Sequence, residues 1–265
     1  MSNFQHRTSG NVHIVAAAGQ VQMVMLVRKR KELFTEFIER EAKEQRLKMV
    51  INGSFVDLGW ALKTSTFVAN AAIDPSESHP VGEVIQEGNM IAGSSERNKF
   101  YFSQNTCGRE RFTTGLGNPP SSSCAAIGGI APIISDGLPY GLLNTYKSGV
   151  PAGAPADREV DAKFVPFLTQ KSNSMFKNLQ NGGTWLGKTA IGFSSKSKAL
   201  IVLVQQDGSQ GLSALEFRQV FIANDVDNAV FLDGSNSATL FYEGEFLVKP
   251  ADRKNSYLTV AVGFK

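Results

Sequence analysis

The chain has 265 residues, of which 42% are hydrophobic and 19% are charged, and it carries a formal net charge of +3. This balance is typical of a globular protein with a substantial core, and the charge is too small to indicate a nucleic-acid partner. The basic run at residues 28–31 is followed at once by acidic residues, as at the solvated start of a helix.

The beginning of the chain shows neither a membrane segment nor an ordinary signal peptide. Its most apolar run, residues 13–27, contains Gln20 and Gln22 and is too short to span a bilayer. Its strong charge follows the apolar part instead of preceding it. We therefore expect no membrane partner, and a cytoplasmic location for the chain as written, unless it has lost a leader or is exported by a route without a visible signal.

The two cysteines, Cys107 and Cys124, could close a disulfide loop. Two thiols alone do not decide the redox compartment, so their pairing stays open at this point. None of the three histidines lies near them in sequence, and they therefore do not predict a zinc site.

Hydrophobic periodicity predicts the first elements as two strands, a helix and a third strand. Residues 12–27 are typical of two strands that break at Ala18-Gly19. Residues 32–48 predict a helix, because apolar residues recur on one face and Glu repeatedly precedes Arg or Lys by one turn. The helix leads into an apolar strand, 49–55, that ends in a polar turn.

The middle of the chain is less regular. Residues 125–134 form an apolar run of small residues, and its glycines predict close approach of the backbone to a ligand or to a neighbouring strand. The other elements predicted here are strands at 66–71, 84–85 and 99–103, a loop at 108–123, a surface excursion at 147–161 and a short helix at 174–180.

The last third has the clearest pattern. Ser213 and Glu216 form a capping box that opens a helix ending near Asn224. Strands are predicted at 188–193, 199–204, 245–248 and 257–264, the first two as a hairpin. We predict an α+β fold: a single domain over residues 1–265, with a mixed, largely antiparallel β-sheet core flanked by a few helices.

Two further apolar strands flank the polar segment Asp233-Gly-Ser-Asn-Ser237. A tight turn needs a few such residues, but this segment carries a carboxylate, two hydroxyls and an amide where a buried strand ends. Sites are commonly built at strand ends. The simpler interpretation is a capped hairpin, and a site is favoured because other parts of the chain agree with it.

The spacing of Asp233, Ser235 and Ser237 is like the start of a calcium-binding EF-hand loop. Ala238 and Gly244 stand where that loop needs a glycine and an acidic residue, which excludes an EF-hand. A looser divalent-cation site on Asp233 has no further support, so we expect no metal and no cofactor.

Residues 182–189 fit the phosphate-loop pattern G-x-x-x-x-G-K-[ST], and residues 230–233 resemble the magnesium-binding strand that accompanies it. Such a loop leaves a buried strand and opens a helix whose N-terminus points at phosphate. Here a helix-like segment precedes and a β-rich segment follows, and Trp185 and Leu186 are bulky for such a loop. A nucleotide hydrolase is therefore a minor alternative.

Several segments, in order, are similar to motifs of one known family. Asn52-Gly-Ser-Phe-Val-Asp57 resembles N-G-G-F-F-D, and residues 126–132 with Asp136-Gly137 resemble a G-G-x-x-P and D/N-G segment. Residues 188–192 resemble R-T-A-I-G, Leu232-Asp-Gly-Ser-Asn-Ser237 resembles L-D-G-G-G-S, and Arg253 stands where the family has a late arginine. From about residue 49 to its end, the chain resembles the phosphodiester glycosidases.

The resemblance implies a hydrolase that cleaves the glycosidic bond of a sugar-1-phosphodiester, or of a related sugar phosphate or nucleotide sugar, to a sugar and a phosphomonoester. It implies that Asp233 activates water at the anomeric carbon or stabilises oxocarbenium character there. Lys188 and Arg253 would grip the phosphate. The substrate-binding residues that it implies are Asn52, Gly53, Ser54, Gly128, Gly129, Gly234, Ser235, Asn236 and Ser237.

Departures from the family pattern leave the substrate open. Lys188 replaces an arginine, which keeps the charge but loses the bidentate fork for phosphate. Ser54, Ser235 and Asn236 replace glycines, so we expect a reshaped pocket. The candidates for the second carboxylate of ordinary glycosidases are Asp57, Asp136 and Glu110. A non-catalytic binding protein for a phosphorylated sugar or nucleotide, on the same fold, is the alternative.

Overall fold

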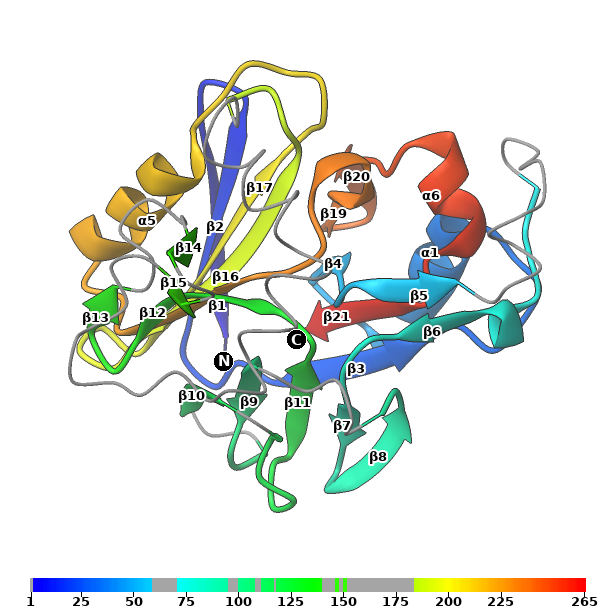
Figure 1. Cartoon of the computed structure of the whole chain (residues 1–265), viewed down its shortest axis with the longest axis horizontal. Helices are drawn as coiled ribbons and strands as arrows, with labels where there is room; N and C mark the ends of the chain where they lie inside the picture. The colour runs from blue at the N-terminus through cyan, green and yellow to red at the C-terminus, as the bar shows by residue number, and fades with distance from the viewer. Residues whose placement is uncertain are drawn as a thin grey trace.

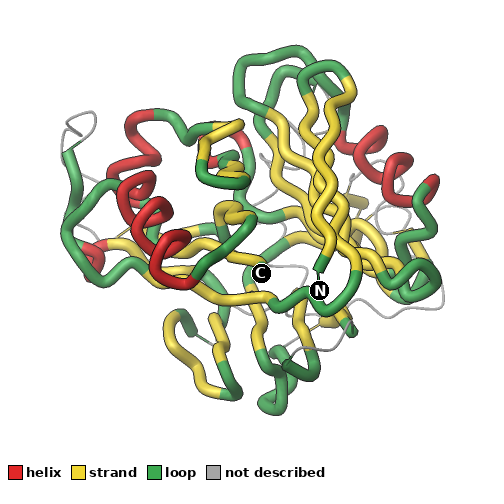
Figure 2. The backbone as a smooth tube through the Cα atoms, turned by 180° about the vertical axis from the view of Figure 1, so that it is seen from behind, coloured by secondary structure: helices red, strands yellow, loops and turns green. Residues whose placement is uncertain are grey.

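The computed structural model describes residues 2–58, 71–94, 100–107, 111–116, 118–139, 146–147, 150–151 and 184–265. Within these ranges the protein is built on three large antiparallel sheets and two two-stranded pairs, and the helices lie on the outside (Figures 1 and 2). The predicted α+β class is therefore confirmed. The helix predicted at 174–180, Glu110 and nearly all of 66–71 and 147–161 lie outside the described residues, and the single-domain assignment stays a prediction.

The first sheet contains the predicted hairpin of residues 188–193 and 199–204, which is confirmed with Lys188 opposite Gln205. Helix α5 (Ala214–Ala223) begins at the predicted capping box on Ser213 and packs Phe221 against this sheet at Gly192. In spatial order the strands are β1 (Asn3–Ser9), β2 (Val12–Ala18), β17 (Ala199–Gln205), β16 (Lys188–Ser194), β18 (Asn228–Phe231), β12 (Ala131–Ser135) and β13 (Leu138–Pro139).

The second sheet is covered by α1 (Phe34–Gln45), which buries Phe34, Phe37 and Ile38 against it. Helix α6 (Asp252–Tyr257) precedes its last strand, so the strand predicted from residue 257 begins later than expected. In spatial order the strands are β20 (Glu245–Val248), β19 (Leu240–Tyr242), β4 (Met49–Asn52), β21 (Val260–Phe264) and β3 (Met23–Val27).

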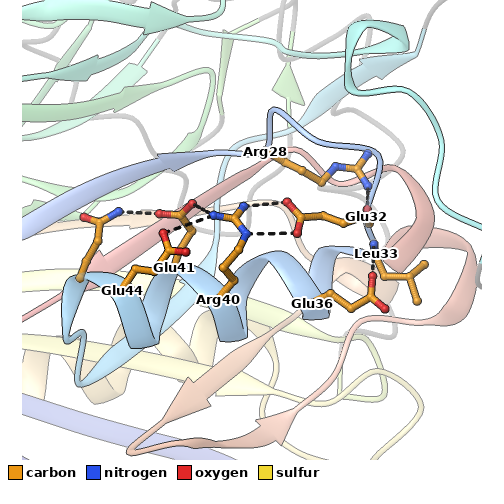
Figure 3. Close-up of polar contacts among 8 residues, drawn as sticks. Arg28, Glu32, Leu33, Glu36, Arg40, Glu41 and Glu44 are labelled. Carbon is orange, nitrogen blue, oxygen red and sulfur yellow. Dashed lines mark hydrogen bonds and ion pairs between the residues drawn. The ribbon is translucent and has the colours of Figure 1, made fainter.

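Charged, mostly half-buried side chains form a network along α1 (Figure 3). Arg40 Nη2 lies 2.7 Å from Glu32 Oε1, and Arg40 also contacts Glu41 and Glu44. Arg28, at the end of β3, donates to the Glu32 backbone carbonyl (Figure 3). The network ties the start of α1 to the segment that follows β3.

The prediction of a loop at 108–123 is wrong in part, because strand β10 (Phe112–Leu116) of the third sheet lies within that range. Phe112 on this strand packs on Phe102, with ring centroids 5.5 Å apart. Cys107 and Cys124 form a disulfide across this sheet, with Cα atoms 5.1 Å apart. The strands in spatial order are β10 (Phe112–Leu116), β9 (Phe100–Gln104), β11 (Ala125–Gly128), β7 (Val84–Gln86) and β8 (Asn89–Ala92). Smaller elements are the pair β5 (Val56–Leu58) and β6 (Ser78–Pro80), the 3-10 turn η1 (Pro75–Glu77), and the pair β14 (Tyr146–Lys147) and β15 (Val150–Pro151).

The third sheet caps the free edge of the second with glutamine side chains. Gln104 Oε1 accepts from the Met23 amide at 2.9 Å, and Gln86 Oε1 accepts from the Met25 amide at 2.7 Å. These bonds satisfy donors of β3 that no strand pairs, because β3 ends the sheet. In the described part of the chain, no helix is both long and apolar enough to cross a membrane.

The chain crosses from the first sheet to the second through the segment that the sequence singled out. Both predicted strands exist, but β18 belongs to the first sheet and β19 to the second, so a capped hairpin is wrong (Figure 1). The connection includes the 3-10 turn η4 (Ser235–Ser237). Asp233 therefore stands at the junction of two sheets.

Candidate active site

Asn52 joins the first two sheets through its side chain, at the end of β4. Its Nδ2 donates to the Asp233 backbone carbonyl at 2.6 Å. Its Oδ1 accepts from Thr189 Oγ1 at 2.7 Å and from the Thr239 amide at 3.0 Å. Thr189 lies on β16 of the first sheet and Thr239 precedes β19 of the second, so Asn52 fixes the junction beside Asp233.

The Asp233 carboxylate is 2% exposed and has both of its side-chain partners on one oxygen. Ser237 Oγ donates to Oδ2 at 2.6 Å, and Lys254 Nζ lies 3.3 Å from the same oxygen. The Asp233 amide donates to the Gly53 carbonyl at 3.0 Å, which holds the backbone against the end of β4. Within the described ranges no hydrogen bond reaches Oδ1.

The cation at Asp233 is Lys254, the neighbour of the predicted Arg253. Arg253 is exposed on α6, whereas Lys254 is half-buried and its ammonium lies 5.2 Å from the Tyr257 ring centroid. Burial alone would lower the pKa of Lys254, but the Asp233 carboxylate and Tyr257 outweigh it and raise that pKa above its ordinary value. Lys254 therefore stays an ammonium at neutral pH.

Helix α6 is anchored near both of its ends, which positions Lys254. At its start the Ala251 amide donates to the Asn236 carbonyl at 2.9 Å, and this bond ties α6 to the Asp233 connection. Near its end the buried Arg28 donates from Nη1 to the Ser256 carbonyl at 3.0 Å. Consecutive helix positions point about 100° apart, so the sequence alone gave no signal that position 254 faces the carboxylate.

Strand register brings two more of the predicted motifs to Asp233. The Leu232 amide donates to the Thr189 carbonyl at 2.9 Å, which sets Lys188 beside Asp233 on the neighbouring strand. On the other side, Ala131 pairs with Phe231, and the residues before Ala131 run toward the end of β18 that bears Asp233. The motifs around positions 52, 129, 188 and 233 thus meet at one end of the first sheet.

The side chain of Lys188 is buried against α5. Its Nζ lies 5.5 Å from the Phe217 ring centroid. Burial lowers the pKa of Lys188 to about 8, and the negative charges of Asp207 and Glu216 offset only part of that effect. The amine is thus partly neutral slightly above neutral pH, and its contact with a phosphate stays a prediction.

The element that begins at Lys188 tests the phosphate-loop alternative. A phosphate loop leads from its lysine into a helix, whose first amides bind the phosphate. Here Lys188 opens strand β16, which pairs on both sides with β17 and β18. The nucleotide-hydrolase alternative is therefore excluded by the element that follows the motif.

Gly128 and Gly129 approach protein backbone closely. The Gly128 amide donates to the Glu83 carbonyl at 2.8 Å. Gly129 has a φ of +68°, and a Cβ there would lie 2.5 Å from the Gly82 nitrogen. The sequence predicted that this backbone approaches a ligand or a neighbouring strand, and the structure shows both glycines against the protein backbone at Gly82 and Glu83.

The serines that replace family glycines differ in their surroundings. Ser54 is buried, and its hydroxyl has no hydrogen-bond partner in the described part of the chain. Ser235 follows Gly234 with a φ of +55°, a conformation that glycine adopts more easily by about 1 kcal/mol. Its amide donates to the Gly187 carbonyl at 2.6 Å, so tertiary contacts hold the strained residue in place.

Of the candidates for a second carboxylate, Asp136 lies far from Asp233. Its amide donates to Asn228 Oδ1 at 3.3 Å, and Asn228 begins β18, whose opposite end leads to Asp233. The side chain of Asp57 and all of Glu110 lie outside what the structure describes.

Asp207 is a nearby carboxylate that sequence reasoning missed. Its Oδ1 accepts from the Gly187 amide at 2.8 Å, and the Gly187 carbonyl in turn accepts from Ser235. An Asp-Gly pair after a strand is an ordinary turn signal, so nothing marked it in the sequence. Among the described residues, no three His, Cys, Asp or Glu side chains gather as metal ligands would.

Comparison with known proteins identifies the family. The sequence profile of the phosphodiester glycosidase family matches residues 45–265. The catalytic domain of zebrafish N-acetylglucosamine-1-phosphodiester alpha-N-acetylglucosaminidase, auto-inhibited by pro-peptide, is similar in structure, with a TM-score of 0.57 and 16% identity over 99% of this chain and 82% of that one. A hypothetical protein from Synechocystis has a TM-score of 0.49 and 13% identity over 99% of this chain and 61% of that one. No match is found among curated proteins.

At 16% identity the likeness to the zebrafish domain shows a shared fold and no more. The profile match is broader, because it covers most of the chain and includes all of the motifs that meet around Asp233. The resemblance noted in the sequence is thereby confirmed, and the chain belongs to the phosphodiester glycosidase family.

Proposed function

We propose that the protein hydrolyses the glycosidic bond of a sugar-1-phosphodiester, or of a related nucleotide sugar, and releases a sugar and a phosphomonoester. The observation that supports this best is the Asp233 carboxylate, which is buried and held by Ser237 and Lys254 through Oδ2, with no donor at Oδ1 among the described residues. A carboxylate held through one oxygen keeps a fixed orientation toward a substrate.

In the proposed reaction, Asp233 Oδ1 accepts a proton from water as the water oxygen attacks the anomeric carbon. The bond from the anomeric carbon to the phosphate oxygen breaks, and the electron pair leaves with the phosphomonoester. A phosphate is a good leaving group and needs charge neutralisation more than a strong acid. Lys254 is the ammonium beside the carboxylate, and we retain Lys188 and Arg253 as further proposed phosphate contacts.

The substrate would be a small phosphorylated sugar, bound by polar groups of the connection that carries Asp233. The buried hydroxyl of Ser54 has no hydrogen-bond partner among the described residues, and the strained backbone of Ser235 supports a functional role for the connection. We propose that the reaction uses no cofactor, since every step assigned above is a proton transfer or a charge contact. Full activity after dialysis against a chelator would support this, and loss that Mg²⁺ or Ca²⁺ restores would contradict it.

The test is an assay of purified protein with sugar-1-phosphodiesters and nucleotide sugars, with products followed by mass spectrometry. We expect sugar and phosphomonoester in equal amounts. Asp233→Asn should lower kcat at least about 1,000-fold, because the carboxylate acts on the reacting centre, while calorimetry still detects substrate binding. Substrate that binds but is recovered intact from the unaltered protein would instead indicate a binding protein on this fold.

A further inference from the structure

Trp185 is a large aromatic side chain that the fold leaves in solvent. It is 55% exposed, and the other exposed large apolar side chains in the described ranges are Met90, Ile91 and Ile222, on β8 and α5. Single exposed apolar residues are common on protein surfaces. What distinguishes Trp185 is the turn that presents it and the loop against which that turn packs.

The turn at Thr184–Gly187 is held by backbone and side-chain hydrogen bonds on both sides of the tryptophan. The Thr184 carbonyl accepts from the Gly211 amide at 2.7 Å and from Gln205 Nε2 at 2.6 Å. The Trp185 carbonyl accepts from the Gly208 amide at 2.9 Å. The backbone is thus fixed while the indole stays in solvent, which is a favourable arrangement for a binding surface, because little further ordering is needed on contact.

The same turn packs on the connection that carries Asp233. The Gly187 carbonyl accepts from the Ser235 amide at 2.6 Å, and a Cβ on Gly187 would lie 2.1 Å from the Ser235 carbonyl oxygen. The two backbones are therefore in direct contact, and only glycine fits at position 187. Trp185 stands two residues before Gly187, the residue that makes this contact.

We propose that Trp185 determines substrate specificity by stacking on a ring in the alcohol group beyond the phosphate. This inference rests on the proposed function. The hydroxyls and amide of the Asp233 connection suit the sugar whose bond is cleaved, and the group beyond the phosphate is the outermost part of the substrate. An exposed indole on a fixed backbone offers that group a flat apolar surface, which a ring fills and a methyl group does not.

The experiment compares two substrates of the same sugar-1-phosphate that differ in one group, the methyl ester and the phenyl ester. For Trp185→Ala we expect KM to rise about tenfold with the phenyl ester and to change less than twofold with the methyl ester, with kcat unchanged. Trp185→Phe should restore most of the affinity. Ile222→Ala, which removes an exposed apolar side chain on α5, is the matched control and should change neither KM.

An equal rise in KM for both esters would overturn the proposal, because the indole would then contact the sugar. An unchanged KM for both esters would also overturn it. A second measurement tests the contact of the indole with the ring separately from the proposed hydrolysis. Trp185 is one of only two tryptophans, so its fluorescence reports contact without turnover. In Asp233→Asn protein the phenyl ester should quench emission that the Trp185→Phe variant lacks, and the methyl ester should not, even if neither ester is ever hydrolysed.

Discussion

Asn52 and Asp233 are joined by a hydrogen bond, but their side chains differ in how many of their polar atoms are bonded to the protein. Both are buried, and Asn52 Nδ2 reaches the Asp233 carbonyl at 2.6 Å. Asn52 also donates weakly to Gly53 and accepts from Thr189 and Thr239, so both of its N–H groups and both acceptor positions of its Oδ1 are occupied. Among the described residues, nothing donates to Oδ1 of Asp233. These two hydrogen-bonded motif residues therefore differ: Asn52 links two sheets through all of its polar atoms, whereas the described side-chain contacts of Asp233 are all on one oxygen.

A polar residue in a family motif can have all of its hydrogen-bonding positions filled within the protein. Substrate binding by Asn52 stays a prediction, and a sugar hydroxyl could reach the side chain only by displacing one of its protein contacts. Its contacts favour a structural role that places Asp233. Four predictions test this division.

The largest expected effect is on stability at Asn52. Asn52→Ala should lower the free energy of unfolding by about 3 to 4 kcal/mol, because it leaves buried partners on both sheets without a hydrogen bond. Urea unfolding followed by circular dichroism would measure this. Ser54→Ala is the matched control, since its buried hydroxyl has no partner in the described residues, and it should lose less than about 1 kcal/mol. Unchanged stability in Asn52→Ala, with a raised KM, would reverse the assignment.

The next effect separates two adjacent cations. Lys254→Met should lower kcat/KM by about 10- to 100-fold, because it removes the ammonium at Asp233 and leaves a buried carboxylate with one partner fewer. Arg253→Met removes a proposed phosphate contact from an exposed position of the same helix, where solvent weakens the attraction, and should lower kcat/KM only about threefold. Steady-state kinetics on the two variants decides between them. A larger loss at Arg253 would support the original sequence prediction over the position seen in the structure.

The pH dependence of kcat/KM can decide whether Lys188 has a structural role or contacts the phosphate. Burial lowers its pKa to about 8, so the positive charge is present below pH 8 and is lost above it. If the ammonium contacts phosphate, as we propose, kcat/KM should fall about tenfold per unit above pH 8. Lys188→Arg should remove this decline, because an arginine keeps its charge. A pH profile without a decline in the unaltered protein would leave Lys188 a structural residue.

The smallest effect is expected at Ser237, whose hydroxyl orients the Asp233 carboxylate at 2.6 Å. Ser237→Ala should lower kcat about fivefold, which corresponds to about 1 kcal/mol for one hydrogen bond, while Lys254 still holds the carboxylate. Stopped-time product assays would detect this change. A loss as large as that of Asp233→Asn would show that Ser237 takes part in the chemistry itself.

The sequence by itself determined the local elements and the family. The period of apolar residues predicted α1 and the β16–β17 hairpin, and the capping box at Ser213 predicted the start of α5, because these features depend on neighbours within a few residues. Short motifs in a fixed order sufficed for the family, and they included Asp233.

Only the tertiary structure decided how those pieces act together. Strands β18 and β19 read as a hairpin in sequence, yet each finds its partners in a different sheet, since long-range pairing and not the turn between them sets their positions. The anchoring of α6 places Lys254, and not Arg253, beside the Asp233 carboxylate. The Oδ1 atom of Asn52 accepts hydrogen bonds from Thr189 and Thr239, which lie in two other parts of the fold. Contacts between residues far apart in sequence leave no local pattern, which is why the site's polar residues could be named in advance but their roles could not.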